Sequence, residues 1–391
     1  MSKNENVIAP LYSTFQFVGY PIIPKDKFFI SGNNGEGFIS NSIRFGLKID
    51  DSNTCWVEIS GGYNEKNNYP IKTISTSNEK LEVLWKDRFD PVIVSNVADF
   101  KKIKIQLKNN DEVQKFLHPY DAIQILKNGL NKDVLYFVSG DVRIERYFNT
   151  KLNTYSTIIK YVATQIVVAK EKIEKDGETE IRIPEKPRAN ATMEFIFNKD
   201  SLDESRFKSD KKIDVTAYVT SYDRESKKTI FLPINLIING EKLDFNNQEH
   251  IKKFDFLKKC FTVKGKKYYR TQFKCGTISG REVDEIKIED LTTFQKEQIA
   301  LGLKTFEQIK IAMQNKKAGS RITEIRLLQP TEKYPDGNEE TEYIEEDFIV
   351  PEPAPKTEKF EDIEKKTLFD DPTFDTKEIK KDDDYGDLFG W

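Results

Sequence analysis

The chain has few of the residues that metal sites and most enzymes need. Its 391 residues include only two histidines, His118 and His250, and three cysteines, Cys55, Cys260 and Cys275. The histidines lack the i, i+4 spacing of a helical zinc site, and the cysteines include no C-x-x-C pair. We therefore expect no metal and no other cofactor, histidines that are neutral or cap a helix, and reduced core cysteines.

Long hydrophobic runs are also missing. No stretch approaches the ~20 apolar residues that cross a bilayer, and residues 1–6 lack the apolar segment of a signal peptide. An odd number of cysteines without close pairing fits a reducing compartment better than a disulfide framework. These absences predict a cytoplasmic protein that has no membrane partner.

Groups for catalysis are scarce as well. The glycine-rich stretch 32–37 lacks the Lys-Ser/Thr of a phosphate-binding loop and carries Glu36 where phosphate would lie. Carboxylates gather at 370–371 and 382–384, but in a segment whose composition predicts disorder, where a two-metal geometry could not be held. The sequence therefore predicts a protein that is not an enzyme and has no catalytic residues.

What the chain does have is a strong separation of charge. Residues 331–391 contain 21 acidic and 8 basic residues, a net charge of −13, whereas residues 1–330 contain 44 acidic and 54 basic residues, a net charge of +10. The acidic segment is also interrupted by prolines, and such a composition buries too little apolar surface to fold. A cationic body joined to an acidic tail is typical of a protein that binds polyanions and regulates this binding itself.

Apolar and polar residues alternate in the first part of the body, as in strands with one buried face. Residues 42–49 and 54–60 flank a turn-forming stretch, so we expect a hairpin there. Residues 120–129 predict a short helix, and two long strands, 134–147 and 157–169, follow it. This order matches an oligonucleotide-binding (OB) barrel, which is a five-stranded Greek-key barrel.

A second β-rich region follows a charged, proline-containing stretch. Its strands are expected at 192–197, 213–222, 229–238, 258–263 and 268–277, with hairpin turns at 223–228 and 264–266 and a helix at 294–313. Whether this region is a second OB barrel stays open at this point. We predict a mainly β protein with an OB-like Greek-key barrel (1–170), a charged linker or excursion (171–190), a second β-rich domain with a C-terminal helix (191–330) and a disordered acidic tail (331–391).

Single-stranded nucleic acid is bound by cations along its phosphates and by aromatic rings on which bases stack. Three segments, 143–155, 264–274 and 85–89, interleave the two kinds of residue, and Trp56 is a further candidate for the concave face. Strand aromatics more often form a core and flanking lysines a solvated face, so each segment also has a purely structural interpretation. The predicted nucleic-acid-binding residues are Arg143, Arg146, Tyr147, Lys151, Tyr155, Lys264, Lys266, Lys267, Tyr268, Tyr269 and Arg270.

The acidic segment ends in Asp382-Asp383-Asp384-Tyr385-Gly386-Asp387-Leu388-Phe389-Gly390-Trp391. This end, in which aspartates precede terminal aromatics, resembles the acidic tips of bacterial and phage single-stranded DNA-binding proteins. The resemblance implies that the tip recruits replication or recombination proteins and competes with DNA for the groove. It also implies that partner binding rests on Asp382, Asp383, Asp384, Asp387, Phe389 and Trp391. The size of the chain and its two β-rich regions favour a phage or mobile-element member.

The sequence therefore predicts a sequence-independent single-stranded DNA-binding protein that acts in DNA replication or recombination, in the bacterial host cytoplasm if a phage encodes it. Its binding should weaken with salt. Two alternatives stay open. One is a structural or assembly protein of a virion or mobile element that binds no nucleic acid, and the other is a protein-only replisome adaptor that uses Phe389 and Trp391.

Overall fold

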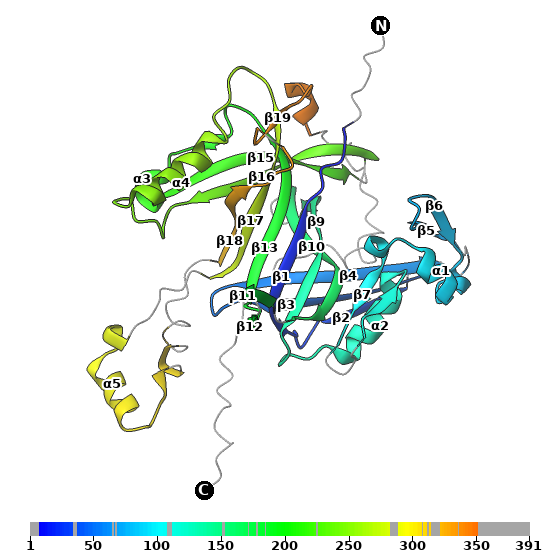
Figure 1. Ribbon diagram of the computed structural model, residues 1–391, viewed down its shortest axis with the longest axis horizontal. Helices are drawn as coiled ribbons and strands as arrows, with labels where there is room; N and C mark the ends of the chain where they lie inside the picture. Colours follow the sequence, from blue (N-terminus) through cyan, green and yellow to red (C-terminus); the bar gives the residue numbers. More distant parts are fainter. Residues whose placement is uncertain are drawn as a thin grey trace.

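The computed structural model describes residues 8–33, 37–64, 66, 69–107, 112–150, 153–170, 172–176, 179–183, 185–223, 226–281, 288–306, 308–310, 313, 321–334 and 336–350. Most of its strands join a single sheet of 15 strands, and few helices accompany them. The chain is therefore mainly β, which confirms the predicted fold class. Figure 1 shows two β-rich bodies that meet where a strand of one lies beside a strand of the other.

The first body is a closed barrel. Its first strand pairs with the second, the second with the third, the third with the fifth in parallel, the fifth with the fourth, and the fourth returns to the first. A helix joins the third strand to the fourth. This order is the OB arrangement that the sequence predicts. The strands are β1 (Thr14–Ile22), β3 (Phe38–Lys48), β4 (Thr54–Asn64), β9 (Tyr136–Asn149) and β10 (Thr154–Val168), and the helix is α2 (Pro119–Gly129).

His118 caps α2, as the sequence predicts for one of its histidines. The Nδ1 atom of His118 accepts the backbone N–H of Tyr120 at 3.2 Å, and Pro119 occupies the first helical position. Burial lowers the pKa of His118, which keeps the imidazole neutral and able to accept this hydrogen bond. Ala122, Ile123 and Leu126 then face the barrel core.

The second body repeats the same strand order and connecting helix. It is therefore a second OB barrel, which settles the question that the sequence leaves open. Its strands are β13 (Arg188–Phe197), β15 (Lys212–Asp223), β16 (Lys228–Asn239), β17 (Tyr269–Arg281) and β18 (Arg321–Pro330), and its helix is α4 (Gln248–Lys259).

Two local predictions in this second body are wrong. Residues 258–263, expected as a strand, form the end of α4 and the turn after it, so 264–266 connect a helix to a strand and are not a hairpin turn. The helix expected over 294–313 begins at the predicted cap, Thr292, but it is not one continuous helix: α5 (Thr293–Ala300) is followed by non-helical residues 301–305, and residues 306, 308–310 and 313 are helical again. Gly302 follows with φ of 69°, a left-handed conformation that ends a helix.

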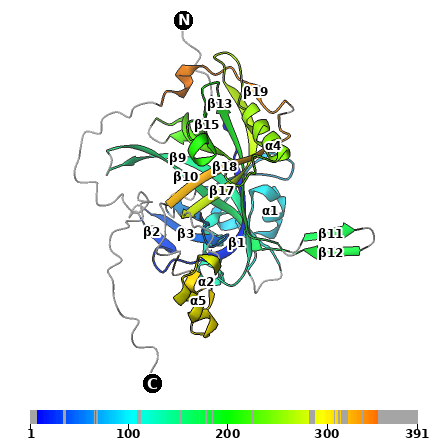
Figure 2. The ribbon, with the colours of Figure 1, turned by 90° about the vertical axis from the view of Figure 1, so that its left-hand side faces the viewer.

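The remaining elements are excursions from the two barrels. The hairpin β11–β12 projects away from the body in Figure 2, and α5 lies apart from both barrels in Figure 1. β5 and β6 pair with each other, while β2 joins β3, β7 joins β8 and β10, and β14 joins β15. The bounds are β2 (Phe29–Asn33), β5 (Ile71–Ile74), β6 (Lys80–Val83), η1 (Trp85–Asp87), α1 (Pro91–Asn96), η2 (Asp99–Lys101), β7 (Ile103–Ile105), β8 (Gln114–Phe116), β11 (Lys172–Asp176), β12 (Thr179–Ile183), β14 (Leu202–Asp203), α3 (Phe207–Asp210) and η3 (Ile288–Asp290).

The two barrels are joined by their first strands. β1 pairs with β13 in antiparallel fashion, from Thr14 opposite Thr192 to Val18 opposite Arg188, and one hydrophobic core runs through both barrels. The chain passes between them through β11 and β12, where the sequence places the linker 171–190. The continuous core packs the two barrels against each other, and the predicted division into domains at 1–170 and 191–330 stays a prediction.

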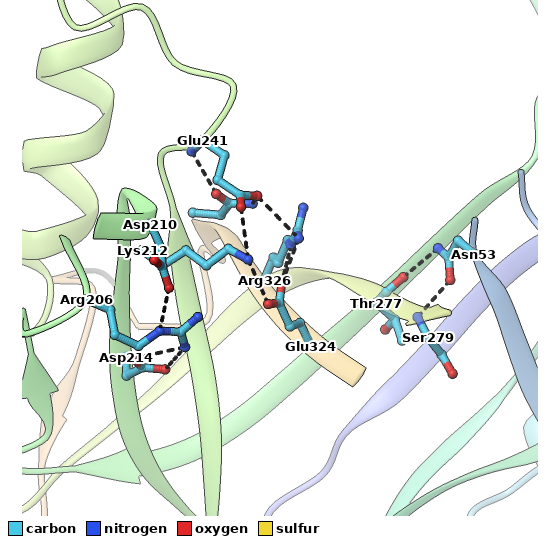
Figure 3. A network of polar contacts seen from close by, with 11 residues as sticks. Asn53, Arg206, Asp210, Lys212, Asp214, Glu241, Thr277, Ser279, Glu324 and Arg326 are labelled. Atoms are coloured by element: carbon cyan, nitrogen blue, oxygen red, sulfur yellow. Dashed lines mark hydrogen bonds and ion pairs between the residues drawn. The ribbon is translucent and has the colours of Figure 1, made fainter. Parts of the chain in front are cut away.

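Asn53 fastens the two barrels at a second point. It lies in the turn between β3 and β4, and only 3 % of its surface is exposed. Its Nδ2 donates to the Thr277 carbonyl at 3.0 Å, and its Oδ1 accepts the Ser279 N–H at 2.8 Å, so one side chain satisfies two backbone groups of β17 (Figure 3). Gly280 permits this approach, because a Cβ there would lie 1.6 Å from the Ser52 carbonyl oxygen.

A buried ion-pair network closes the second barrel at the edge of β18 (Figure 3). Lys212 of β15 lies 3.0 Å from Glu324 of β18 and 3.1 Å from Glu241, and Arg326 lies 2.6 Å from Glu324. Because Lys212 is only 5 % exposed, its charge needs both carboxylates. The network therefore fixes β18 against the rest of the barrel.

The boundary of the predicted acidic tail is corrected by the structure. Residues 331–334 and 336–350 continue from β18 across the second barrel, where β19 (Glu339–Glu340) pairs with β17 and η4 (Glu345–Phe348) lies against β16. Apolar residues among the acids make this folding possible, since Tyr334 is buried and Tyr343 and Phe348 join a hydrophobic cluster. The predicted partner-binding residues Asp382, Asp383, Asp384, Asp387, Phe389 and Trp391 lie outside the described residues.

Candidate nucleic-acid interface

The outer surface of β3 and β4 carries a cation and aromatic rings. Ile43, Phe45 and Val57 point into the barrel, so alternate residues point outward. Arg44 and Trp56 are two of these, and the Arg44 guanidinium lies 5.7 Å from the centre of the Trp56 ring. In OB barrels the face of the second and third strands binds oligonucleotides. We call Phe38, Arg44 and Trp56 the barrel-1 face.

Glycines opposite the rings shape this face. Trp56 is paired across the strands with Gly46, and a Cβ on Gly46 would lie 3.7 Å from the Trp56 ring. The Phe38 ring, 40 % exposed, lies against Gly62, where a Cβ would approach it to 2.7 Å. Because neither glycine carries a side chain, neither one covers the Trp56 or Phe38 ring, and an uncovered ring can accept a stacked base.

In the segment 85–89, two of the residues that could bind DNA pack against the first barrel instead. Trp85 stacks on Tyr63 with ring centres 4.3 Å apart, and the Arg88 guanidinium lies 4.1 Å from the Trp85 ring. Arg88 also bonds Asp121 of α2 at 2.9 Å. Through these contacts Trp85 and Arg88 attach η1 to the first barrel. Phe89, 57 % exposed, is the ring of this segment that remains accessible.

The hairpin of β9 and β10 forms as predicted, but its residues have different roles. Arg143 is exposed and lies 3.9 Å from Asp141, which leaves it accessible to phosphate. Arg146, which the sequence predicts as a DNA contact, forms an ion pair of 3.1 Å with Asp223 of the second barrel, and both side chains are 7 % exposed. Arg146 also lies 4.5 Å from the Tyr155 ring.

In this conformation Arg146 therefore serves the contact between the barrels, and Tyr155 packs against its guanidinium. Tyr147 is half-buried on β9, and its neighbour Phe148, which is 41 % exposed, contacts Tyr155 with ring centres 5.2 Å apart. This agrees with the expectation that a strand turns only one of two successive aromatics outward. Lys151, the remaining residue predicted in this hairpin, lies outside the described residues.

In the segment 264–270, some residues are exposed and free to contact DNA, and others contact another part of the protein. Lys264 and Lys266 are exposed, whereas Lys267 forms an ion pair with Glu340. Tyr269 packs on Phe197, with ring centres 6.0 Å apart. Tyr268 is 7 % exposed, so it cannot stack a base in this conformation.

Arg270, also predicted as a DNA contact, pairs with Glu194 at 2.6 Å. The Glu194 side chain is fully buried and also bonds Lys333 at 2.7 Å and the hydroxyl of Tyr334. Burial by itself raises the pKa of this carboxyl, but the hydrogen bonds from Lys333, Tyr334 and Arg270 outweigh burial and lower it to about 2. Glu194 therefore anchors residues 331–334 to the second barrel.

No disulfide and no metal-binding cluster is present among the residues that the structure describes. Cys55, Cys260 and Cys275 are free, and burial raises the pKa of the Cys55 thiol to about 12. No group of three or more His, Cys, Asp or Glu side chains gathers in the described ranges to hold a metal ion. No helix within those ranges has both the length and the apolar character needed to span a membrane.

Comparisons with known proteins add little. No protein-family model matches the chain, and no curated protein matches it. Among solved structures, it is similar to a deletion mutant of the single-stranded DNA-binding protein from Thermus aquaticus, with 8 % identity over 70 % of this chain and 89 % of that chain and a TM-score of 0.29. The wild-type protein from the same organism matches with 8 % identity over 69 % of this chain and 87 % of that chain, with a TM-score of 0.26. Such low scores carry no argument, so the OB assignment rests on strand order.

Proposed function

We propose that this protein binds single-stranded DNA without sequence preference and acts in DNA replication or recombination. The observation that carries the proposal is the barrel-1 face, where Arg44 and Trp56 lie on the outer surface of the second and third strands of an OB barrel. A guanidinium beside a flat, half-buried indole supplies the two contacts that a single strand needs, a cation for phosphate and a ring for the base.

Further cations would extend the path of the strand. Arg143, Lys264 and Lys266 are exposed, and in this proposal they hold phosphates. Binding through such contacts releases condensed counterions, so affinity falls with salt by a slope of about 0.7 per phosphate neutralised on a single strand. Aromatic stacking does not distinguish one base from another, which accounts for the proposed lack of sequence preference.

The C-terminal residues have a separate proposed role. The segment 351–391 contains 13 acidic and 7 basic residues and ends in two aromatics, Phe389 and Trp391. In this proposal the tip recruits replication or recombination proteins, with Asp382, Asp383, Asp384 and Asp387 directing it to a basic partner surface and the two rings entering an apolar pocket. Support for this role comes from its charge and its terminal aromatics.

The barrel-1 face can be tested with two substitutions and a matched control. Trp56→Ala should weaken binding of a labelled oligothymidine by about fivefold to a hundredfold, because one stacked base contributes ~1–3 kcal/mol. Arg44→Ala should lower the slope of log affinity against log salt by about 0.7. Lys253→Ala removes an equally exposed charge on α4, outside the face, and should leave both unchanged. Unaltered affinity in Trp56→Ala would show that the barrel-1 face is not the binding surface.

A further inference from the structure

The second barrel has an aromatic site on the face that corresponds to the barrel-1 face. Tyr218 of β15 and Phe231 of β16 lie on the outer surface of its second and third strands, where the inward positions belong to Val219 and Leu232. Tyr268, just before β17, lies beside them, with its ring centre 6.5 Å from that of Tyr218. We call Tyr218, Phe231 and Tyr268 the barrel-2 aromatic site.

A ring from the same chain occupies this site. Phe348 of η4 stacks on Tyr268 at 4.1 Å and 17°, and on Phe231 at 4.5 Å and 21°. Its ring centre also lies 4.6 Å from that of Tyr218. A planar ring that is nearly parallel to two others at these separations has the geometry of a stacked base. The site is therefore built to accept a flat ring, and Phe348 fills it in this structure.

The segment that carries Phe348 is held by backbone and charge. We call residues 336–350 the strap. Its β19 pairs with β17, and the N–H of Thr341 donates to the Tyr268 carbonyl at 2.8 Å. Thr271 donates to the Gly337 carbonyl at 2.6 Å, and Glu340 pairs with Lys267. The Glu340–Lys267 ion pair is exposed, and exposed ion pairs are individually weak.

The composition of the strap resembles that of the proposed ligand. Seven carboxylates lie from Asp336 to Asp347, the aromatic Tyr343 lies among them, and the aromatic Phe348 follows the last of them. A single strand also alternates anions with flat rings. One of these carboxylates, Glu340, already pairs with Lys267, and the two rings contact Phe231. The strap thus offers Lys267 an anion and Phe231 a ring, the same two groups that a bound strand would offer them.

From this overlap we infer that the barrel-2 aromatic site is a nucleobase-stacking site that the strap closes, so that single-stranded DNA gains access to it by displacing Phe348. The inference rests on the proposed function and extends it to a second surface. It also explains why Tyr268 and Lys267, which the sequence predicts as DNA contacts, are occupied here. Displacement is feasible because the Glu194 anchor at Lys333 and Tyr334 precedes the strap and can stay in place while the strap leaves.

The test compares full-length variants for binding of labelled oligothymidine. Phe348→Ala removes the competing ring and should tighten binding at least about fivefold, because the competent fraction of the site rises. Ile349→Ala is the matched control, since Ile349 is adjacent, 69 % exposed and absent from the site. Glu340→Gln breaks the ion pair with Lys267 but leaves every ring in place, so it should tighten binding in the same direction without altering the hydrophobic cluster.

Two further backgrounds locate the effect. Tyr218→Ala combined with Phe348→Ala should lose the gain, because the site then lacks one of its rings. Trp56→Ala combined with Phe348→Ala should keep the gain relative to Trp56→Ala alone, because the two faces are separate. A gain that survives Tyr218→Ala would overturn the proposed site.

Failure of the inference and failure of the proposed function give different results. If the wild-type protein binds oligothymidine, and Phe348→Ala and Glu340→Gln bind it no more tightly, the strap is a structural element and the inference is wrong while the function stands. If neither the wild-type protein nor these variants bind, the proposed function is wrong and the inference falls with it.

Discussion

Asn53→Ala should lower the free energy of unfolding far more than an alanine substitution at an exposed asparagine would, because Asn53 links the two barrels. The side chain satisfies the Thr277 carbonyl and the Ser279 N–H at 3.0 and 2.8 Å, and it is 3 % exposed. Alanine leaves both backbone groups buried without these partners, and each orphaned group costs about 1–3 kcal/mol. We therefore expect a loss of about 2–5 kcal/mol in the free energy of unfolding.

The assay is urea unfolding of the full-length protein, followed by circular dichroism and by tryptophan fluorescence. Trp56 and Trp85 both belong to the first barrel, so fluorescence reports mainly on that barrel, whereas circular dichroism reports on both. If Asn53 couples the barrels, the two signals should separate in the variant. Asn246→Ala, at an exposed loop position, is the control. A loss below about 0.5 kcal/mol in the unfolding free energy of Asn53→Ala, with coincident transitions in the two signals, would refute the proposal that Asn53 couples the barrels.

Three further predictions concern the ion pairs and the close approach between the barrels. Arg146→Ala removes the ion-pair partner of the buried Asp223, which keeps only hydrogen bonds such as that from the Ser226 N–H, so it should cost about 3–5 kcal/mol in urea unfolding. The exposed Arg143→Ala should change stability little and lower the salt slope of DNA binding. Equal stability of the two variants would contradict these assignments. The pKa of Glu194 is lowered from an ordinary 4.5 to about 2, so its contribution to stability is present above pH ~4.5 and is lost as the pH falls towards 2. Glu194→Gln should flatten this part of the plot of stability against pH. An unchanged plot would argue against the role of Glu194 in anchoring residues 331–334. Gly280→Ala should lower the free energy of unfolding as Asn53→Ala does, because the new Cβ displaces the turn at Ser52. Wild-type stability of Gly280→Ala would show that this turn can move without cost.

The alternation of apolar residues was enough to predict the first barrel. The turn at Asp50–Asn53, the helix that ends at Gly129 and the two long strands after it occur in the structure in the predicted order. The second barrel was harder to predict, because the sequence analysis expects no helix over α4 and assigns residues 258–263 to a strand. Asn247 caps α4 through the N–H of Glu249, and Phe254 and Leu257 form its buried stripe. Phe254 and Leu257 are three positions apart, a helical spacing that could have identified α4.

The candidate site was only partly predictable. Arg44 was missed, although it lies between Ile43 and Phe45 in an alternating strand and so must point outward. The occupied state of Arg146, Arg270 and Tyr268 could not be predicted, because each is paired with a residue from a distant part of the chain. Local composition reports which residues can bind a strand, but only the tertiary fold shows which of them are already bound to the protein itself.

The most direct test of the account is the fluorescence anisotropy of a labelled oligothymidine titrated with the full-length wild-type protein across a salt series, with duplex DNA of the same length as the control. The account predicts binding of the single strand that weakens steadily as salt rises and that exceeds binding of the duplex. No binding of the single strand at low salt, or equal binding of the two DNAs, would contradict it.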